Sequence, residues 1–214
     1  MNIDEILLAV LSGNNTKIQE AESCLRQIAK SDYGNMLCAL AEKISDENIS
    51  IDKRQLSASI IRNSIREGDS SNWFKLNTKI KDLIKTNVLS SLASKHKEIR
   101  KSGSLAVAGI ASVEIPKNLW KDIIYTLITT ANHTNINFKI SSVITIGYIA
   151  VEIAPNHFSV EEKNGMVNAI VTLIENDKNS EVLNCAIEAI MNLIPYSRSI
   201  QDNYVKFYLF SLKF

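Results

Sequence analysis

The chain has few histidines and cysteines, two residue types common in catalytic and metal sites, and these residues are not clustered in the sequence. The 214 residues include three histidines and three cysteines, which are His96, His133, His157, Cys24, Cys38 and Cys185. The histidines fall on predicted turns or helix edges, without a paired nucleophile, metal-ligand spacing or a glycine-rich phosphate loop. The cysteines are odd in number, widely spaced and set among apolar positions, which favours reduced core thiols. We therefore predict no enzyme activity, no cofactor and no metal.

Composition points to a globular protein whose partners depend on local surfaces. Hydrophobic residues make up 45% of the chain, and 24 Lys and Arg against 23 Asp and Glu leave a net charge of +1. Such a balance produces no global field toward nucleic acid or an anionic membrane. The chain shows no secretory leader and no uncharged run of the roughly 18 residues that cross a bilayer. We expect a soluble intracellular protein without nucleic-acid or membrane partners.

A repeat determines the predicted architecture. Pro116, Pro155 and Pro195 follow apolar helical stretches at intervals of 39 and 40 residues. The segments VAGIASVEI and TIGYIAVEI are versions of one helix 38 positions apart, so Gly109 and Glu114 recur as Gly147 and Glu152. A period of this length is typical of stacked helical pairs, each of which buries its apolar face against its neighbours. The predicted fold is an all-α superhelix, an α-solenoid, with about five hairpins and one extra C-terminal helix.

Apolar periodicity and turn signals divide the chain into those hairpins. The predicted repeats cover residues 1–30, 31–68, 71–113, 116–153, 158–194 and, in part, 200–214. Thr16 with Gln19 and Ser159 with Glu162 have capping-box spacing at two helix starts.

Two helices of this array depend on weaker signals. One long helix is expected from about Trp73 to Ala93. Another is expected to begin at Pro116, where a missing N–H costs little, and to carry Trp120 on its apolar stripe. The last segment, from about Asp202 to Lys213, is too apolar for an exposed terminus, so we expect the chain to be part of a longer solenoid.

The strings GIASVEIPKNLW and IGYIAVEIAP closely resemble the N-terminal part of importin-β, a nuclear transport receptor of HEAT repeats. IIRNSI at 60–65, Trp73 and the amphipathic opening from Ile3 to Arg26 support the resemblance, which covers essentially the whole chain. It implies a receptor that moves between cytoplasm and nucleus and acts in protein import. In that family the importin-α adaptor and cargo are held by later repeats, so this chain is not expected to hold them.

The resemblance also implies two binding surfaces. The second helices of the first four repeats would grip the GTP-bound form of the small GTPase Ran. Arg62 and Asn63 match the position where a basic residue reaches the GTPase, and Glu152 matches an acidic position. Arg66 would substitute for a further family lysine, because this sequence has Gly68 there.

A pocket for phenylalanine-glycine (FG) nucleoporins is implied on the other side of the array, between the first helices of repeats five and six. The matching positions are Val167, Asn168 and Val171 on one helix and Leu209 and Phe210 on the next. An apolar groove of this kind buries a phenylalanine ring at roughly 25 cal/mol per Å². The alternative to this function is a generic HEAT scaffold or adaptor subunit without a link to Ran.

Overall fold

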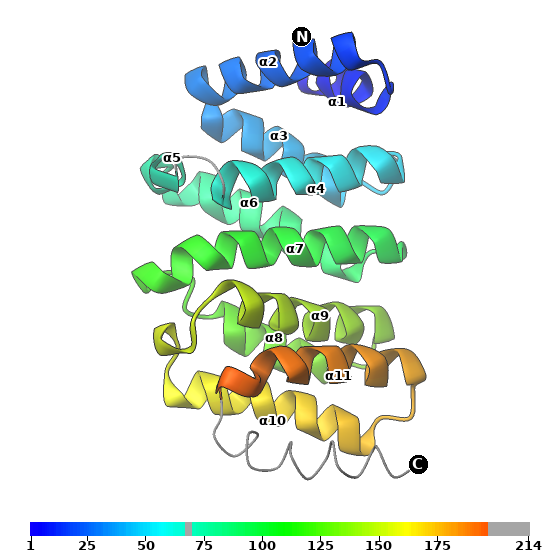
Figure 1. The fold of residues 1–214 in the computed structure, drawn as a ribbon, viewed down its shortest axis with the longest axis vertical. Helices are drawn as coiled ribbons and strands as arrows, with labels where there is room; N and C mark the ends of the chain where they lie inside the picture. The colour runs from blue at the N-terminus through cyan, green and yellow to red at the C-terminus, as the bar shows by residue number, and fades with distance from the viewer. Residues whose placement is uncertain (67–69, 197–214) are drawn as a thin grey trace. The chain divides into compact units, whose positions relative to one another are not determined.

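The computed structural model describes residues 1–66 and 70–196 (Figure 1). Within these residues the protein is all-helical and has no strand, so the predicted all-α class is confirmed. The α-helices are α1 (Ile3–Leu11), α2 (Asn15–Ser31), α3 (Tyr33–Ser45), α4 (Ile51–Arg66), α5 (Ser70–Lys75), α6 (Thr78–Ser90), α7 (Lys97–Glu114), α8 (Ile123–Ala131), α9 (Ile136–Glu152), α10 (Val160–Asn176) and α11 (Ser180–Leu193). The chain forms two compact units, Met1–Val113 and Glu114–Phe214.

The first unit consists of helical hairpins. Helix α1 packs on α2 and α3 packs on α4, while α3 also packs on α6 of the following hairpin. Fully buried side chains such as Leu37, Ile61 and Ile84 come from α3, α4 and α6 and fill the space between these helices. Because each helix is apolar along one stripe only, it must bury that stripe against its neighbours.

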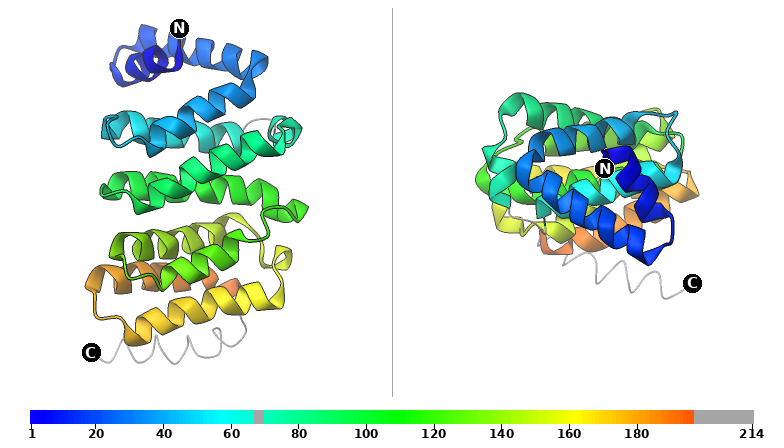
Figure 2. Two further views of the ribbon diagram at one scale, coloured as in Figure 1. Left: turned by 180° about the vertical axis from the view of Figure 1, so that it is seen from behind. Right: turned by 90° about the horizontal axis from the view of Figure 1, so that it is seen from above.

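The second unit has two hairpins in two layers. Helix α8 pairs with α9 and α10 with α11, and contacts also join α8 to α10 and α9 to α11 (Figures 1 and 2). Gly165 of α10 faces α8, because a Cβ at this position would lie 2.8 Å from Ile128 Cδ1, the end of a side chain that can turn away. The paired layers place first helices on one side of the unit and second helices on the other.

Helix capping follows one sequence prediction and departs from another. The Ser159–Glu162 capping box is confirmed at the start of α10, with both reciprocal hydrogen bonds present. The predicted Thr16 cap is wrong, since the N-cap of α2 is Asn14, whose side chain accepts from the Lys17 backbone N–H. Asparagine is a strong N-cap residue, and with Asn14 as its cap α2 begins two residues earlier than it would with Thr16.

The single helix predicted from Trp73 to Ala93 is also wrong. The segment contains α5 and α6, and Asn77 caps α6 by accepting from Ile80 N–H at 2.9 Å. Asparagine side chains compete with the backbone for helical hydrogen bonds, so an apolar stripe can continue across a helix break.

Trp120 does not lie on a helix. Residues Ile115–Lys117 form a 3-10 turn, α8 begins at Ile123, and Trp120 has a φ of 51°. A bulky residue at positive φ is uncommon and requires support from surrounding structure. The helix predicted to start at Pro116 therefore starts at Ile123 instead.

Candidate partner-binding faces

Helix α4 carries three of the residues predicted to contact a GTPase. Its core positions include Ala58, Ile61 and Ile65. Beside this buried stripe, Arg62 is half-buried while Asn63 and Arg66 are exposed. Arg62 and Arg66 are four positions apart and so lie on the same side of the helix. This side of α4 can offer guanidinium groups to carboxylate or carbonyl acceptors of a partner.

Glu152, the fourth predicted residue, belongs to the second unit. It is the last residue of α9 and is half-buried, next to Val151, which is 66% exposed. Its repeat counterpart Glu114 is 1% exposed. Two glutamates that match in the sequence repeat therefore differ in their access to a partner.

The residues predicted for a nucleoporin pocket lie at different depths on α10. Asn168 is exposed and Val171 is half-buried, whereas Val167 is 5% exposed and forms part of the core. Leu209 and Phe210 lie outside the described residues. Asn168 and Val171 are the members of this set whose side chains reach the surface in the described structure.

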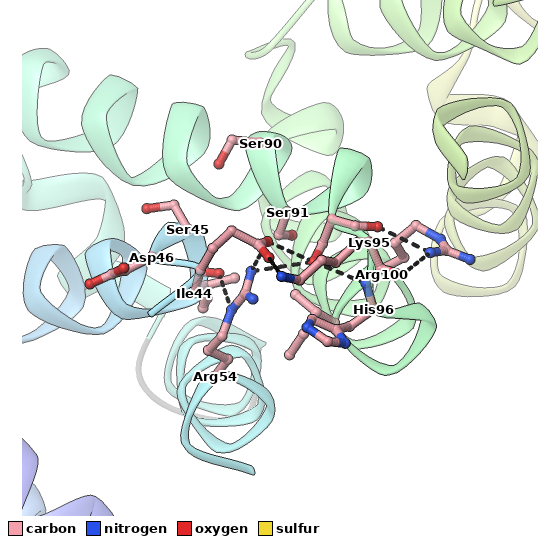
Figure 3. A network of polar contacts seen from close by, with 12 residues as sticks. Ile44, Ser45, Asp46, Arg54, Ser90, Ser91, Lys95, His96 and Arg100 are labelled. Carbon is pink, nitrogen blue, oxygen red and sulfur yellow. Dashed lines mark hydrogen bonds and ion pairs between the residues drawn. The ribbon is translucent and has the colours of Figure 1, made fainter. Parts of the chain in front are cut away.

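A buried arginine joins two turns of the first unit (Figure 3). Arg54, on α4, is 1% exposed. Its Nε donates to the Ile44 carbonyl at 2.9 Å and its Nη2 donates to Glu47 Oε1 at 2.9 Å. Ser94, in the turn before α7, donates to the same Glu47 oxygen at 2.9 Å. The arginine thus ties the end of α3 to the α6–α7 turn.

Basic residues recur at the same place on three second helices. Arg54, Arg100 and Lys139 are each the fourth residue of their helix, α4, α7 and α9. Arg100 Nη1 donates to the carbonyls of Ser94 at 3.0 Å and Lys95 at 3.2 Å (Figure 3). In the second unit, Lys139 Nζ donates to Asp177 Oδ2 of the α10–α11 turn at 2.7 Å. These side chains hold turns at the start of helices, and two of these helices, α4 and α9, also carry predicted GTPase contacts.

The carboxylates of these ties are stabilised in the charged form. The Arg54 hydrogen bond is the main cause that lowers the pKa of Glu47, with further lowering from Ser94. The Lys139 hydrogen bond is the main cause that lowers the pKa of Asp177, and the backbone N–H of Asn179 adds to it. Both shifts arise from donors that prefer the ionised carboxylate.

The three cysteines are free thiols, and the surroundings of Cys38 lower its reactivity. Cys24, Cys38 and Cys185 are unbridged and half-buried. Burial is the main cause that raises the pKa of the Cys38 thiol, and the carboxylates of Glu42 and Asp32 raise it further. A raised pKa lowers thiolate character and therefore reactivity.

The described residues contain no candidate metal site and no candidate membrane span. In residues 1–66 and 70–196, no three His, Cys, Asp or Glu side chains come together in a way that suits a metal ion. None of the helices in these ranges combines the length and the apolar character needed to span a bilayer.

Known proteins resemble the chain over most of its length, although no family model matches it. Importin subunit beta-1 of Arabidopsis thaliana is 21% identical over 211 residues, which are 95% of this chain and 24% of the relative. Importin subunit beta-1 of Schizosaccharomyces pombe is 27% identical over 179 residues, 80% of this chain and 21% of the relative. The chain thus spans less than a quarter of the length of these curated relatives.

Solved structures agree with these relatives. Kap95 in its complex with Nup1 matches 99% of this chain and 26% of its own, at a TM-score of 0.81 and 21% identity. Kap95p, in a structure concerned with its binding to RanGDP, matches 95% of this chain and 25% of its own, at a TM-score of 0.84 and 22% identity. The fold is that of the karyopherins, which are built from HEAT repeats. Within that class, the chain is homologous to importin subunit beta-1.

Sequence reasoning missed the residues that position these faces. The shared helix position of Arg54, Arg100 and Lys139 was a usable signal, since a basic residue recurs at the fourth place of three second helices, α4, α7 and α9. Gly109 was recognised as a repeat residue, but its contact with Arg62 requires coordinates.

Proposed function

We propose that this chain is an importin-β-type transport module that binds Ran-GTP through its second helices and FG nucleoporins through its first helices, without catalysis. The observation that supports the proposal best is the match to Kap95 over 99% of the chain. Kap95 has been solved with Nup1, and the Kap95p structure above concerns RanGDP. A module of this kind would act in the cytoplasm and nucleus during protein import.

Arg62, Asn63, Arg66 and Glu152 are the proposed GTPase contacts. Helix α4 supports this assignment, because its two arginines lie on one side with Asn63 between them in sequence. A guanidinium presents five donors in a planar fork and suits the carboxylates and carbonyls of a folded protein surface. Val167, Asn168, Val171, Leu209 and Phe210 remain the proposed nucleoporin residues by family position.

Titration with purified Ran tests the GTPase assignment. The chain should bind Ran loaded with a non-hydrolysable GTP analogue, and Arg62→Glu should weaken binding by about tenfold or more, because an interface arginine replaced by an acid adds repulsion. Lys79→Glu is the control, since Lys79 is exposed on α6, a first helix that lies outside the proposed GTPase contacts. Equal loss in both variants would contradict the proposed face, and no binding by the wild type would leave the generic scaffold function.

A nucleoporin peptide tests the other surface separately. An FG-repeat peptide should bind weakly. Val171→Asp on α10 should reduce its binding by several-fold, because a phenylalanine ring docked there would cover the carboxylate and strip it of water. Thr172→Asp places the same charge on the neighbouring exposed position and serves as the control. If both variants bind like the wild type, α10 is not the docking helix.

A further inference from the structure

Gly109 is buried although it lies on the more exposed side of α7. Helical spacing places it on one side with Ser102, Leu105 and Ser112, at intervals of seven, four and three residues. Those three side chains are half-buried, whereas Gly109 is buried. Another part of the first unit must therefore cover the helix at this point.

Arg62 of α4 provides that cover. A Cβ built on Gly109 would lie 2.9 Å from Arg62 Cγ and 3.6 Å from both its Cα and its Cβ. The first distance is shorter than real Cβ atoms show, and Cγ stands at the base of the side chain rather than at its flexible end. The arginine stem lies across α7 in this way because residue 109 has no side chain.

This contact fixes the start of the arginine side chain. Its Nε atom is buried, while the residue as a whole is half-exposed. Long cationic side chains often bury their apolar stem and keep the charged end at the surface. A stem held against a helix has fewer rotamers to lose on binding, so less affinity is lost to ordering.

We propose that Gly109 is a positioning residue for Arg62: its missing side chain lets α4 and α7 clamp the arginine stem and direct the guanidinium toward the bound GTPase. The proposal deepens, and rests on, the proposed Ran-binding function. It adds a determinant on α7 that makes no partner contact of its own.

The repeat-equivalent glycine has a different role. A Cβ on Gly147 would lie 3.2 Å from Ala189 Cα and 3.3 Å from its Cβ, so this glycine admits the backbone of α11. Ala189 has no long side chain to direct. The same repeat position therefore serves helix packing in the second unit and arginine placement in the first.

The test compares Gly109→Ala with Gly165→Ala in the full chain. Gly165 is a matched control, because an added Cβ would meet only the Cδ1 end of Ile128, which can rotate away. Gly109→Ala should weaken binding of GTP-analogue-loaded Ran about tenfold, with helicity unchanged by circular dichroism. Gly165→Ala should change it by less than about twofold. In an Arg62→Ala background, Gly109→Ala should have no further effect, since the arginine that it positions is gone.

Arginine labelling supplies a readout that does not need Ran. Phenylglyoxal modification, followed by peptide mass spectrometry, should be slower at Arg62 than at the exposed Arg26 in the wild type, and faster at Arg62 in Gly109→Ala. Wild-type reactivity at Arg62 equal to that of Arg26 would overturn the clamp, and so would full Ran affinity in folded Gly109→Ala. Protected Arg62 in a wild type that does not bind Ran would instead refute the proposed function while leaving the placement of the arginine intact.

Discussion

The two units hold their turns with different chemistry at the same helix position. In the first unit, the forked guanidinium of Arg54 donates to the Ile44 carbonyl near the end of α3 and to the carboxylate of Glu47. Ser94 of the next turn donates to the same carboxylate. In the second unit, the single ammonium of Lys139 reaches one carboxylate of the next turn, Asp177. An arginine can link its own turn and the following one at once, whereas a lysine provides a point charge for one of them.

The second unit has an additional side-chain hydrogen bond at the other end of its helices. The hydroxyl of Tyr196, just after α11, donates to the carbonyl of Ile153 at the end of α9, and the carbonyl of Ala150 lies 3.4 Å from the same hydroxyl. Tyr196 is 5% exposed, and its ring contacts Phe158 with centroids 5.5 Å apart. The position of a side chain in the repeat thus sets which turn it can bond, while its residue type sets how many neighbouring groups it bonds.

The largest expected effect comes from removing the arginine tie. Arg54→Ala should lower the free energy of unfolding of the first unit by about 3 kcal/mol, because it leaves the buried Ile44 carbonyl without its donor and Glu47 without its cation. Urea denaturation followed by hydrogen exchange in α3 and α6 measures this. Arg26→Ala, which breaks an exposed pair with Glu22 at 3.6 Å, should cost less than about 0.5 kcal/mol. Equal losses would remove the distinction between a buried tie and a surface pair.

A smaller effect is expected at the opposite end of the second unit. Tyr196→Phe should destabilise that unit by about 1.5 kcal/mol, since the Ile153 carbonyl loses a buried donor. Tyr125→Phe is the control, because Tyr125 is 75% exposed. Burial also raises the pKa of Tyr196 above the ordinary range, so the wild type should lose stability as the pH rises above about 10, where the unfolded tyrosine ionises. Thermal melts at pH 8 and pH 11 should show this dependence reduced in Tyr196→Phe.

The lysine tie should give the smallest change. The pKa of Asp177 is lowered in the folded protein, so the Asp177 carboxylate contributes stability at pH values above its unfolded pKa of about 3.9. This contribution is lost as the pH falls through the lower folded pKa. Asp177→Asn should therefore cost about 1 kcal/mol at pH 7 and almost nothing below the folded pKa. Glu47→Gln in the first unit should cost less at pH 7, because the Glu47 side chain is 43% exposed against 13% for Asp177. Chemical denaturation at both pH values measures the pair, and a pH-independent loss in Asp177→Asn would show that the ion pair is not its source.

Sequence patterns predicted much of the helical framework for identifiable reasons. The opening helix and the Ser159 capping box depend on contacts within three or four residues, and both are present. The unbroken helix from 73 to 93 and the helical Trp120 were wrong, because periodicity registers apolar stripes but not a competing asparagine cap or a residue at positive φ. Local signals fail where the side chains of a turn compete with the helix for hydrogen bonds.

The exposure of the candidate residues was predictable in part. Arg62, Asn63 and Arg66 were placed on one helix, and the structure leaves Asn63 and Arg66 exposed. Val167 was expected to line a surface pocket, yet it is 5% exposed. Whether an apolar residue on a helix faces the core or a pocket depends on neighbouring helices distant in sequence, which no single apolar stripe specifies.

By itself, the sequence determined the all-α class, the repeat and the resemblance to importin-β, because these follow from short-range periodicity and from strings of residues that recur every 38 to 40 positions. Tertiary structure alone decided that Gly109 meets Arg62 while its repeat counterpart Gly147 meets Ala189. It also decided that Arg54 is buried between two turns. The two glycine contacts join residues more than 40 positions apart in sequence. The distance between two packed helices is set by all the side chains between them, not by either residue of the pair.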